Sequence, residues 1–498
     1  MSHRSRFANR TLMLCLSTAV GLMTCASAHA QDSWDAIYLA GSKIGHVHTF
    51  VEKVKDRGRD YLRVRIDIEQ RIQRDKDVSV TKLMYGTIEA LDGQVLRLDT
   101  LTEAGEQRLR GHGDVIQGEM KFVFEGAGAR QELVIPWGPK VRGPYAPEQS
   151  MAHKPMKENE ERSLKMFMPE LNKICDIRLQ SRVIEPVILG DGLKHPLLRV
   201  DQTTRVDAKP RPEFDARLWV DPDGQVLKTE QDLLGGVVMY RTTEESAKAP
   251  GGPIKLDLIL ASGIKVPRKI PAPEQTRHVK YRVLLKNGNP AQVFPADPRQ
   301  TVLPEADQSS AILEVRSLGP LDGQPDPGEV AAEYLRPNVL VTSQDSRVRS
   351  LTQRATKGTV DPWEKAVRIN QWVFRNVTDK NFKVAFAAAN EVAQNRSGDC
   401  TEHAVLAAAM CRAAGIPSRV AIGLIYVEQP GVFGYHMWTE VHINNRWVAL
   451  DPSWDQSAVD ATHIKLTDSS LDGVSPFSVF VPLLQVMGKL EIEPLELR

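Results

Sequence analysis

The chain has 498 residues, and its 64 lysine and arginine residues nearly balance 63 aspartate and glutamate residues, giving a formal net charge of +1. A chain of this length has room for about three domains, each large enough for its own hydrophobic core. Because the two signs of charge are mixed along the chain, nothing in the composition points to a nucleic-acid partner, and we expect globular domains.

The first thirty residues have the composition of an export signal. Arginine residues come first, an apolar run follows over residues 12–23, and Ala28 and Ala30 supply the small residues of a cleavage site. This order predicts a signal peptide over residues 1–30. A single membrane anchor is the alternative, but the run is shorter than the roughly 20 residues that a bilayer requires. Lipidation at Cys25 fits poorly because threonine precedes it, so we expect a periplasmic or secreted protein without a transmembrane segment.

Residues 31–250 are predicted to form a β-rich N-terminal domain. Apolar and charged residues alternate strictly over residues 62–69, the pattern of an antiparallel strand with one face in water. Two Asp-Gly pairs, at Asp92 and Asp223, predict hairpin turns, and both continue with Gln-Val-Leu. This repeat indicates either two related β-modules or a coincidence between common turns. Residues 136–161, rich in proline, glycine and charge, are interpreted as a long loop or a boundary.

A second and smaller β-rich domain is expected over residues 251–318. Residues 279–285 alternate in the same way, which predicts a further strand. The next stretch, residues 319–343, begins with many proline, glycine and aspartate residues, and we interpret it as a linker. A helix is predicted after Asp361, because this N-cap residue is followed by Pro362 at the first helical position.

Cys400 stands at the start of a second predicted helix, which covers residues 401–414. Asp399 and Glu402 have the spacing of a capping box, and Gly415 suits the left-handed residue that closes a helix. The positive end of the helix dipole favours the thiolate form of a cysteine at this place. Cys400 is therefore the candidate nucleophile.

Three cysteines remain once the signal peptide is removed, in a compartment that oxidises thiols. A disulfide between Cys175 and Cys411 would leave Cys400 as the free thiol. Cys411, however, lies three helical turns beyond Cys400 among alanine and methionine residues, which is typical of a small buried hydrophobic residue. We favour the interpretation without a disulfide.

His436 and Asp451 fall in a predicted β-hairpin, whose strands flank a turn at Asn444 and Asn445. Counting back from the turn pairs Trp438 with Asp451, which puts His436 on the same face as Asp451. Such a diagonal pair is separated by roughly 7 to 8 Å between backbone positions, within reach of a carboxylate and an imidazole. A slip of one residue in the register would put the two side chains on opposite faces.

These three residues have the chemistry of a thiol enzyme. Cys400 would attack an amide carbonyl, His436 would take the thiol proton and return it to the leaving amine, and Asp451 would orient the imidazole. The backbone N–H of Cys400 would donate to the oxyanion, and we expect a second donor that the sequence does not identify. The resulting thioester would then react with water or with an amine.

Other polar and aromatic residues near these positions have structural interpretations. His403 lies one helical turn beyond Cys400, and His442 lies roughly 20 Å along its strand from the candidate base, so we expect both to be packing or surface residues. Trp438 is expected either in the core or on the wall of the active-site cleft. Asp455 is the alternative acid if the hairpin register differs. No short ligand pair links these groups, so we expect neither a metal nor a cofactor.

Four ordered motifs together resemble a known family, and the resemblance extends over residues 344–460. The motifs are Gly398-Asp399-Cys400, Ala414-Gly415-Ile416-Pro417-Ser418-Arg419-Val420, Tyr435-His436-Met437-Trp438-Thr439-Glu440-Val441 and Trp447-Val448-Ala449-Leu450-Asp451-Pro452-Ser453-Trp454. This part of the chain resembles the transglutaminase-like superfamily, whose core is of the papain type. The resemblance implies an α+β fold in which the helix bearing the cysteine packs on an antiparallel sheet. It also implies that Cys400, His436 and Asp451 are nucleophile, base and orienting acid.

The sequence thus predicts a catalytic domain over residues 344–470 and a C-terminal extension over residues 471–498. The predicted function is that of an exported thiol enzyme acting on amide bonds of protein or peptide substrates, as a protease, amidase or transamidase. The N-terminal β-rich region is a candidate surface for a cell-envelope partner. The alternative is an inactive protein that uses the same fold for binding or assembly in the envelope.

Overall fold

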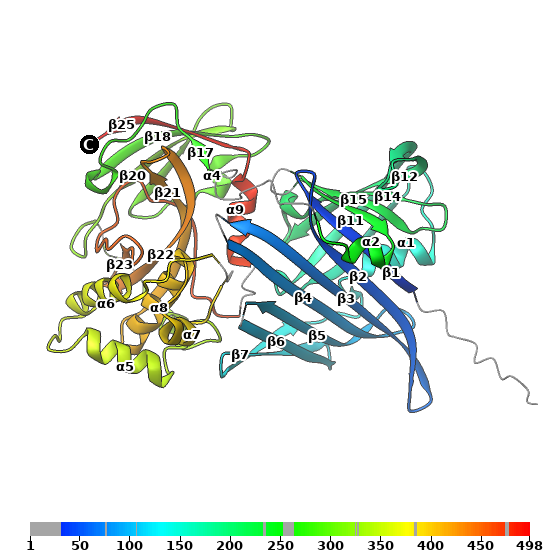
Figure 1. Cartoon of the computed structure of the whole chain (residues 1–498), viewed down its shortest axis with the longest axis horizontal. Coiled ribbons are helices and arrows are strands. Elements are labelled where there is room, and N and C mark those ends of the chain that lie inside the picture. The colour runs from blue at the N-terminus through cyan, green and yellow to red at the C-terminus, as the bar shows by residue number, and fades with distance from the viewer. Residues whose placement is uncertain are drawn as a thin grey trace, which may run out of the picture.

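The computed structural model describes residues 31–74, 77–105, 107–232, 236–251, 263–323, 325, 328–382, 386–473 and 478–498. The predicted signal peptide, residues 1–30, lies outside the described residues. Figure 1 shows a large β-rich part beside a mixed part with helices, and the short helix α9 (Val481–Val486) lies between them. The fold is α+β, which confirms the predicted class.

One continuous sheet contains the described strands from β1 to β16, in the order β8-β7-β6-β5-β4-β3-β2-β1-β16-β15-β14-β12-β11-β10-β9, with β13 paired to β12. Neighbouring strands are antiparallel except for β9 and β10. The strand predicted at residues 62–69 is confirmed as part of β3. The strands are β1 (Gln31–Leu39), β2 (Ser42–Asp56), β3 (Arg59–Arg74), β4 (Asp77–Ala90), β5 (Val95–Ala104), β6 (Gln107–Ile116), β7 (Glu119–Gly126), β8 (Ala129–Pro136), β9 (Val141–Arg142), β10 (Glu161–Met168), β11 (Lys173–Ile188), β12 (Lys194–Val206), β13 (Lys209–Pro210), β14 (Ala216–Val220), β15 (Val226–Gln231) and β16 (Val237–Thr242).

Both predicted Asp-Gly turns join neighbouring strands of this sheet. Gly93 connects β4 to β5 with φ +81°, and Gly224 connects β14 to β15 with φ +80°. Only glycine adopts this backbone region without strain. Residues 136–161 are not only a loop, because they contain β9 and the helix α1 (Ala146–His153). This eight-residue helix has no side-chain cap, although Pro147 and Glu148 stand in its first turn.

A second sheet has four described strands in the order β19-β20-β18-β25. The strand predicted at residues 279–285 is confirmed as β18. Its neighbour β25 comes from the end of the chain, so the predicted C-terminal extension supplies an outer strand of this sheet. The division into domains otherwise stays a prediction. The strands are β18 (His278–Leu285), β19 (Gln300–Pro304), β20 (Ser310–Arg316) and β25 (Leu490–Leu497).

The third sheet has the order β17-β22-β21-β24, with β23 paired to β22, and helix α8 packs against β21 and β22. Helices α5, α6 and α7 in turn pack against α8. Its strands are β17 (Ile264–Lys265), β21 (Ser418–Val427), β22 (Val432–Ile443), β23 (Arg446–Leu450) and β24 (Ile464–Ser469). The remaining helices are α2 (Glu244–Lys248), α4 (Pro290–Val293), α5 (Ser346–Ala355), α6 (Pro362–Asn376), α7 (Ala389–Asn395), α8 (Cys400–Ala413) and the 3-10 turns η1 (Pro212–Phe214), η2 (Pro273–Gln275), η3 (Ala332–Tyr334) and η4 (Ser478–Phe480).

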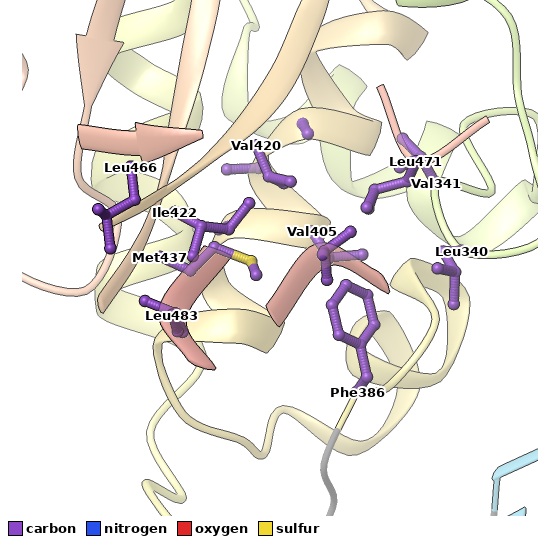
Figure 2. Packing of buried hydrophobic residues seen from close by; sticks show 14 of the residues in the cluster. Leu340, Val341, Phe386, Val405, Val420, Ile422, Met437, Leu466, Leu471 and Leu483 are labelled. Carbon is purple, nitrogen blue, oxygen red and sulfur yellow. The ribbon is translucent and has the colours of Figure 1, made fainter. Parts of the chain in front are cut away.

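Helix α8 is enclosed on all sides. Val405 of α8 packs in a core with Ile422 of β21 and Met437 of β22, and Phe386 and Leu483 close the same core from outside the sheet (Figure 2). A helix that is apolar around its whole circumference belongs in the interior. Each such buried side chain contributes roughly 1.5 to 3 kcal/mol, so the helix that carries Cys400 is held rigidly.

The large sheet also contacts the part of the chain that carries Cys400 directly. The Phe382 backbone N–H donates to Asp77 Oδ2 at 3.0 Å, at the start of β4. Gln485 of α9 donates to Glu213 Oε1 at 3.0 Å. These bonds fix the β-rich part against the segments around Cys400. Among the described helices, none combines the length and the apolar composition that crossing a membrane requires.

Candidate active site

Cys400 is the first residue of α8, and the predicted capping box is confirmed. Asp399 Oδ1 accepts from the Thr401 backbone N–H at 2.8 Å, and Glu402 Oε2 accepts from the Asp399 N–H at 2.9 Å. Gly398 precedes the cap with φ +139°, and a Cβ there would lie 2.4 Å from the Glu402 side chain. The position therefore requires glycine. The far end of the helix closes at Gly415 with φ +80°, as predicted.

The hairpin that carries His436 has the predicted register. Asn444 and Asn445 form the turn with φ values of +50° and +58°, and Thr439 pairs with Leu450. Continuing this register by one residue brings Asp451 opposite Trp438, so the parity argument from the sequence is confirmed.

His436 joins Cys400 and Asp451. Its Nε2 lies 2.6 Å from Asp451 Oδ2, and its imidazole lines the same cavity as Cys400, whose charge acts on it. Since Nε2 faces the carboxylate, Nδ1 is the nitrogen left for the thiol. Burial opposes protonation of the imidazole, but the charges of Asp451 and Cys400 outweigh burial and raise the pKa of His436 to about 9. This arrangement favours the protonated form of His436.

A second histidine, which the sequence reasoning missed, supports Asp451 from behind. The fully buried His463 places Nε2 3.1 Å from Asp451 Oδ2 and Nδ1 3.1 Å from Asp460 Oδ1. Asp451 Oδ1 also accepts from the Ser453 backbone N–H at 2.8 Å. Burial raises the pKa of Asp451, yet its bonds to His436 and His463 hold that pKa well below its usual range. The only sequence signal is a histidine three residues after an aspartate, which is too common to be specific.

The same three side chains could be considered as metal ligands. Ligand atoms of His436, Asp451 and His463 lie within 4.8 Å of one another. Both imidazoles, however, contact the same carboxylate oxygen, Oδ2, at hydrogen-bond distances. A metal bound by all three groups would have to replace both of these bonds. The donor set is therefore explained by hydrogen bonding within the chain.

Three residues near the site, His403, His442 and Trp438, were expected to have structural roles, and the structure places two of them, His403 and Trp438, as expected. His403 is buried, and its Nδ1 lies 2.6 Å from the Asp399 carbonyl oxygen. His442 is half-buried rather than on the surface, with its ring centroid 5.2 Å from that of Trp447. Trp438 is fully buried and belongs to the core.

The three cysteines of the described chain are all free thiols, as favoured from the sequence. Cys175 and Cys411 are buried, and burial raises the pKa of each to about 12. Cys400 is only half-buried and lies at a helix N-terminus. It is therefore the thiol with access to a substrate.

A cavity of about 750 Å³ opens at Cys400, between the catalytic core and the large sheet. One side consists of residues from α8, β21 and β22, including His436. The opposite side consists of residues from β3 to β6, and α9 adds a third wall. No sequence pattern indicated that segments so far apart would share one cavity.

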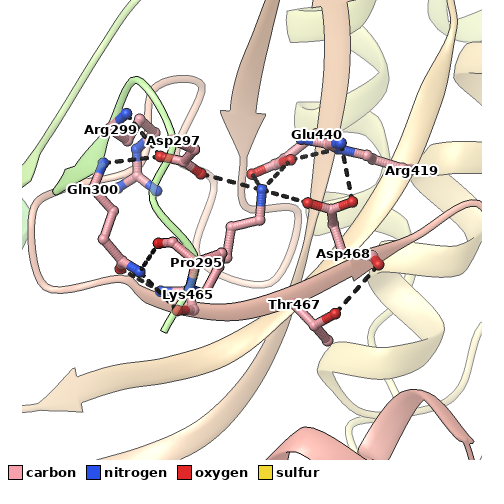
Figure 3. A network of polar contacts seen from close by, with 9 residues as sticks. All are labelled: Pro295, Asp297, Arg299, Gln300, Arg419, Glu440, Lys465, Thr467 and Asp468. Atoms are coloured by element: carbon pink, nitrogen blue, oxygen red, sulfur yellow. Dashed lines mark hydrogen bonds and ion pairs between the residues drawn. The ribbon is translucent and has the colours of Figure 1, made fainter. Parts of the chain in front are cut away.

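Charged residues of the third sheet form a compact cluster with Asp297, shown in Figure 3. Lys465 of β24 is almost fully buried and lies 3.0 Å from Glu440 Oε2, 2.8 Å from Asp468 and 3.2 Å from Asp297. Arg419 lies 2.7 Å from Glu440 Oε2. The cluster links β21, β22 and β24, and so it stabilises the strand that carries His436.

Comparison with known proteins agrees with the geometry. Residues 349–452 match the family model of the transglutaminase-like superfamily, so this part of the chain contains a transglutaminase-like core. No curated protein gives a significant match.

Several solved structures are similar to this chain at low identity. One is a candidate cysteine protease from Cytophaga hutchinsonii, with 14% identity over 44% of this chain and 86% of that chain, at a TM-score of 0.28. Another is the periplasmic domain of TgpA from Pseudomonas aeruginosa, with 15% identity over 39% of this chain and 89% of that chain, at a TM-score of 0.27. A third is a β-barrel-like protein from Brucella abortus, with 12% identity over 43% of this chain and 96% of that chain, at a TM-score of 0.31. Because these scores are low, the assignment rests on the family match.

Proposed function

We propose that this chain is an exported thiol enzyme that acts on amide bonds of protein or peptide substrates through a thioester at Cys400. The observation that carries the proposal is that Cys400, at the N-terminus of a buried helix, shares a cavity with His436, which is hydrogen-bonded to Asp451. The transglutaminase-like core agrees with it.

The proposed reaction begins with the thiolate of Cys400. Sγ attacks the amide carbonyl carbon, and a C–S bond forms as the carbonyl oxygen becomes an oxyanion. The protonated His436 then donates its proton to the leaving amine as the C–N bond breaks. Asp451 keeps the imidazole oriented and stabilises its positive charge. The product of this half-reaction is a thioester and a free amine.

The backbone N–H of Cys400 is suited to bind the oxyanion. It is at the first position of α8, where N–H groups have no acceptor within the helix. The second half-reaction transfers the acyl group to water, which gives hydrolysis, or to an amine, which gives transamidation. In both cases Cys400 is regenerated.

Export is the second part of the proposal and rests on residues 1–30 of the sequence. The predicted signal peptide puts the mature chain in the periplasm or outside the cell, where the large sheet would be available to a cell-envelope partner.

The test is mass spectrometry of a glutamine-rich protein such as casein, incubated with the mature chain and a primary-amine probe. Probe incorporation that Cys400→Ala abolishes would identify amide acyl transfer, and cleavage or deamidation that the same variant abolishes would identify hydrolysis. If neither product forms and Cys400 resists alkylation, the chain is a non-catalytic binding or assembly protein instead.

A further inference from the structure

The cavity at Cys400 carries an inference about the substrate, which rests on the proposed function. We propose that the acyl donor is an amide whose acyl part is an extended aliphatic chain, and that the cavity holds this chain along α9. The peptide or protein is then the amine side of the scissile bond.

The first support comes from α9. Four apolar residues on η4 and α9 line the cavity at positions i, i+3, i+4 and i+7, namely Phe480, Leu483, Leu484 and Met487. This spacing puts them on one face of a helical segment. Between Leu484 and Met487, Gln485 donates to Glu213 of η1 in the β-rich part, which holds α9 in place. Leu483 on this face also packs in the core, and the face borders the cavity as well.

The second support is the apolar character of the walls nearest the catalytic core. Phe374, Phe382 and Phe386 supply aromatic rings, and Ile425 and Val427 of β21 supply aliphatic groups. The wall from β3 to β6 mixes polar and apolar side chains. Cavities of about 300 to 1,000 Å³ lined mainly by apolar groups bind small molecules or chains of similar size, and this cavity of about 750 Å³ lies within that range.

The third support is that the strands bordering the cavity offer no free backbone edge at the lining residues. The described sheet residues that line the cavity are already paired with neighbouring strands, as in Ile72 with Ser79, Thr81 with Ala104 and Ile425 with Gly434. A peptide inside the cavity could not add to either sheet at these residues, so its N–H and C=O groups would depend on the polar side chains of the lining, and any left unpaired would cost free energy. An aliphatic chain has no such groups to satisfy.

The position of the thiol completes the argument. Cys400 and His436 both line the cavity, so the chain would begin at the carbon atom that Sγ attacks. Sγ forms a thioester with the aliphatic acyl group, the C–N bond breaks, and the amine leaves with the proton from His436. Water or a second amine then takes the acyl group from sulfur.

The experiment compares p-nitrophenyl esters of acetate, butyrate, hexanoate and octanoate as acyl donors, with Cys400→Ala as the background. Burial of a methylene group favours binding by up to about fourfold, so kcat/KM should rise with each step and reach at least about tenfold between acetate and octanoate. The substitutions Leu484→Gln and Met487→Gln should each reduce this ratio. Leu495→Gln, an exposed residue of β25, is the matched control and should leave the ratio unchanged. Circular dichroism melting verifies that each variant is folded.

A binding measurement separates this inference from the proposed function. Cys400→Ala cannot react, but it should bind a fluorescent aliphatic fatty acid such as cis-parinaric acid at one site, more weakly when combined with Leu484→Gln. Binding without any turnover by the wild type would sustain the cavity inference and reject the proposed function. Acylation that does not depend on chain length, with no binding of the probe, would sustain the function and overturn the inference.

Discussion

The substitution Asp451→Asn tests whether the charge of this carboxylate creates the thiolate–imidazolium pair. Asparagine keeps the shape and one oxygen of aspartate but removes the negative charge 2.6 Å from His436 Nε2. The pKa of His436 is raised from 6.5 to about 9 because the charges of Asp451 and Cys400 outweigh burial. Without Asp451, burial is opposed by Cys400 alone, and we expect the pKa of His436 to fall by roughly 2 units.

A drop of roughly 2 units corresponds to about 3 kcal/mol, or a factor of about 100 in the population of the charged pair. The assay is the rate of Cys400 alkylation by iodoacetamide as a function of pH. Near neutral pH the variant should react up to about 100-fold more slowly than the wild type. At high pH the two rates should converge, because the thiolate then forms without an imidazolium.

The pH dependence of the alkylation rate distinguishes the loss of charge from structural damage. A variant that is slow at every pH has lost the geometry of the site, and a variant with the wild-type rate at neutral pH would refute the electrostatic argument. Asp455→Asn is the matched control, because Asp455 follows Asp451 closely in sequence but has no hydrogen bond to His436 among the described contacts. It should leave the pH profile unchanged.

Three further predictions concern stability and reactivity. His463→Gln removes the imidazole that hydrogen-bonds the Asp451 carboxylate, and urea unfolding should show a loss of about 2 kcal/mol or more; unchanged stability would contradict this role. Burial opposes ionisation of Glu440, but Lys465 and the neighbouring guanidinium outweigh it and lower its pKa from 4.5 to about 2. Its contribution is therefore complete above pH 4.5 and lost as the pH falls towards 2, so the difference in unfolding free energy between wild type and Glu440→Gln should shrink over that window. Iodoacetamide followed by peptide mapping should label Cys400 in the native protein and spare the two buried thiols; equal labelling of all three would count against its accessibility.

The parts of the site that the sequence predicted are those encoded in contiguous residues. The capping box at Asp399 and Glu402 is a four-residue pattern, and the hairpin register follows from the turn at Asn444 and Asn445. Helix capping and side-chain alternation act over a few residues, so the positions of Cys400 and its partners could be worked out without knowledge of the remaining fold.

The parts that were missed depend on distant segments. His463 reaches Asp451 only because the chain folds back after β23, and no local pattern specifies that return. β25 pairs with β18, about 200 residues earlier in the sequence. The alternation of apolar and polar residues in β25 predicts a strand but does not indicate which strand it pairs with. Helix α1 has no side-chain cap and only eight residues, so its existence depends on packing against the sheet.

The cavity depends both on a local sequence pattern and on contacts between distant segments. The spacing of the apolar residues at 480, 483, 484 and 487 is visible in the sequence, but a buried face and a ligand-binding face have the same pattern. Only the folded structure shows that this face borders the same cavity as Cys400. A chain that filled the cavity would also exclude water from the thioester. The contacts that select the acyl group would therefore also influence whether water or an amine receives it, which links the identity of the substrate to the outcome of the reaction.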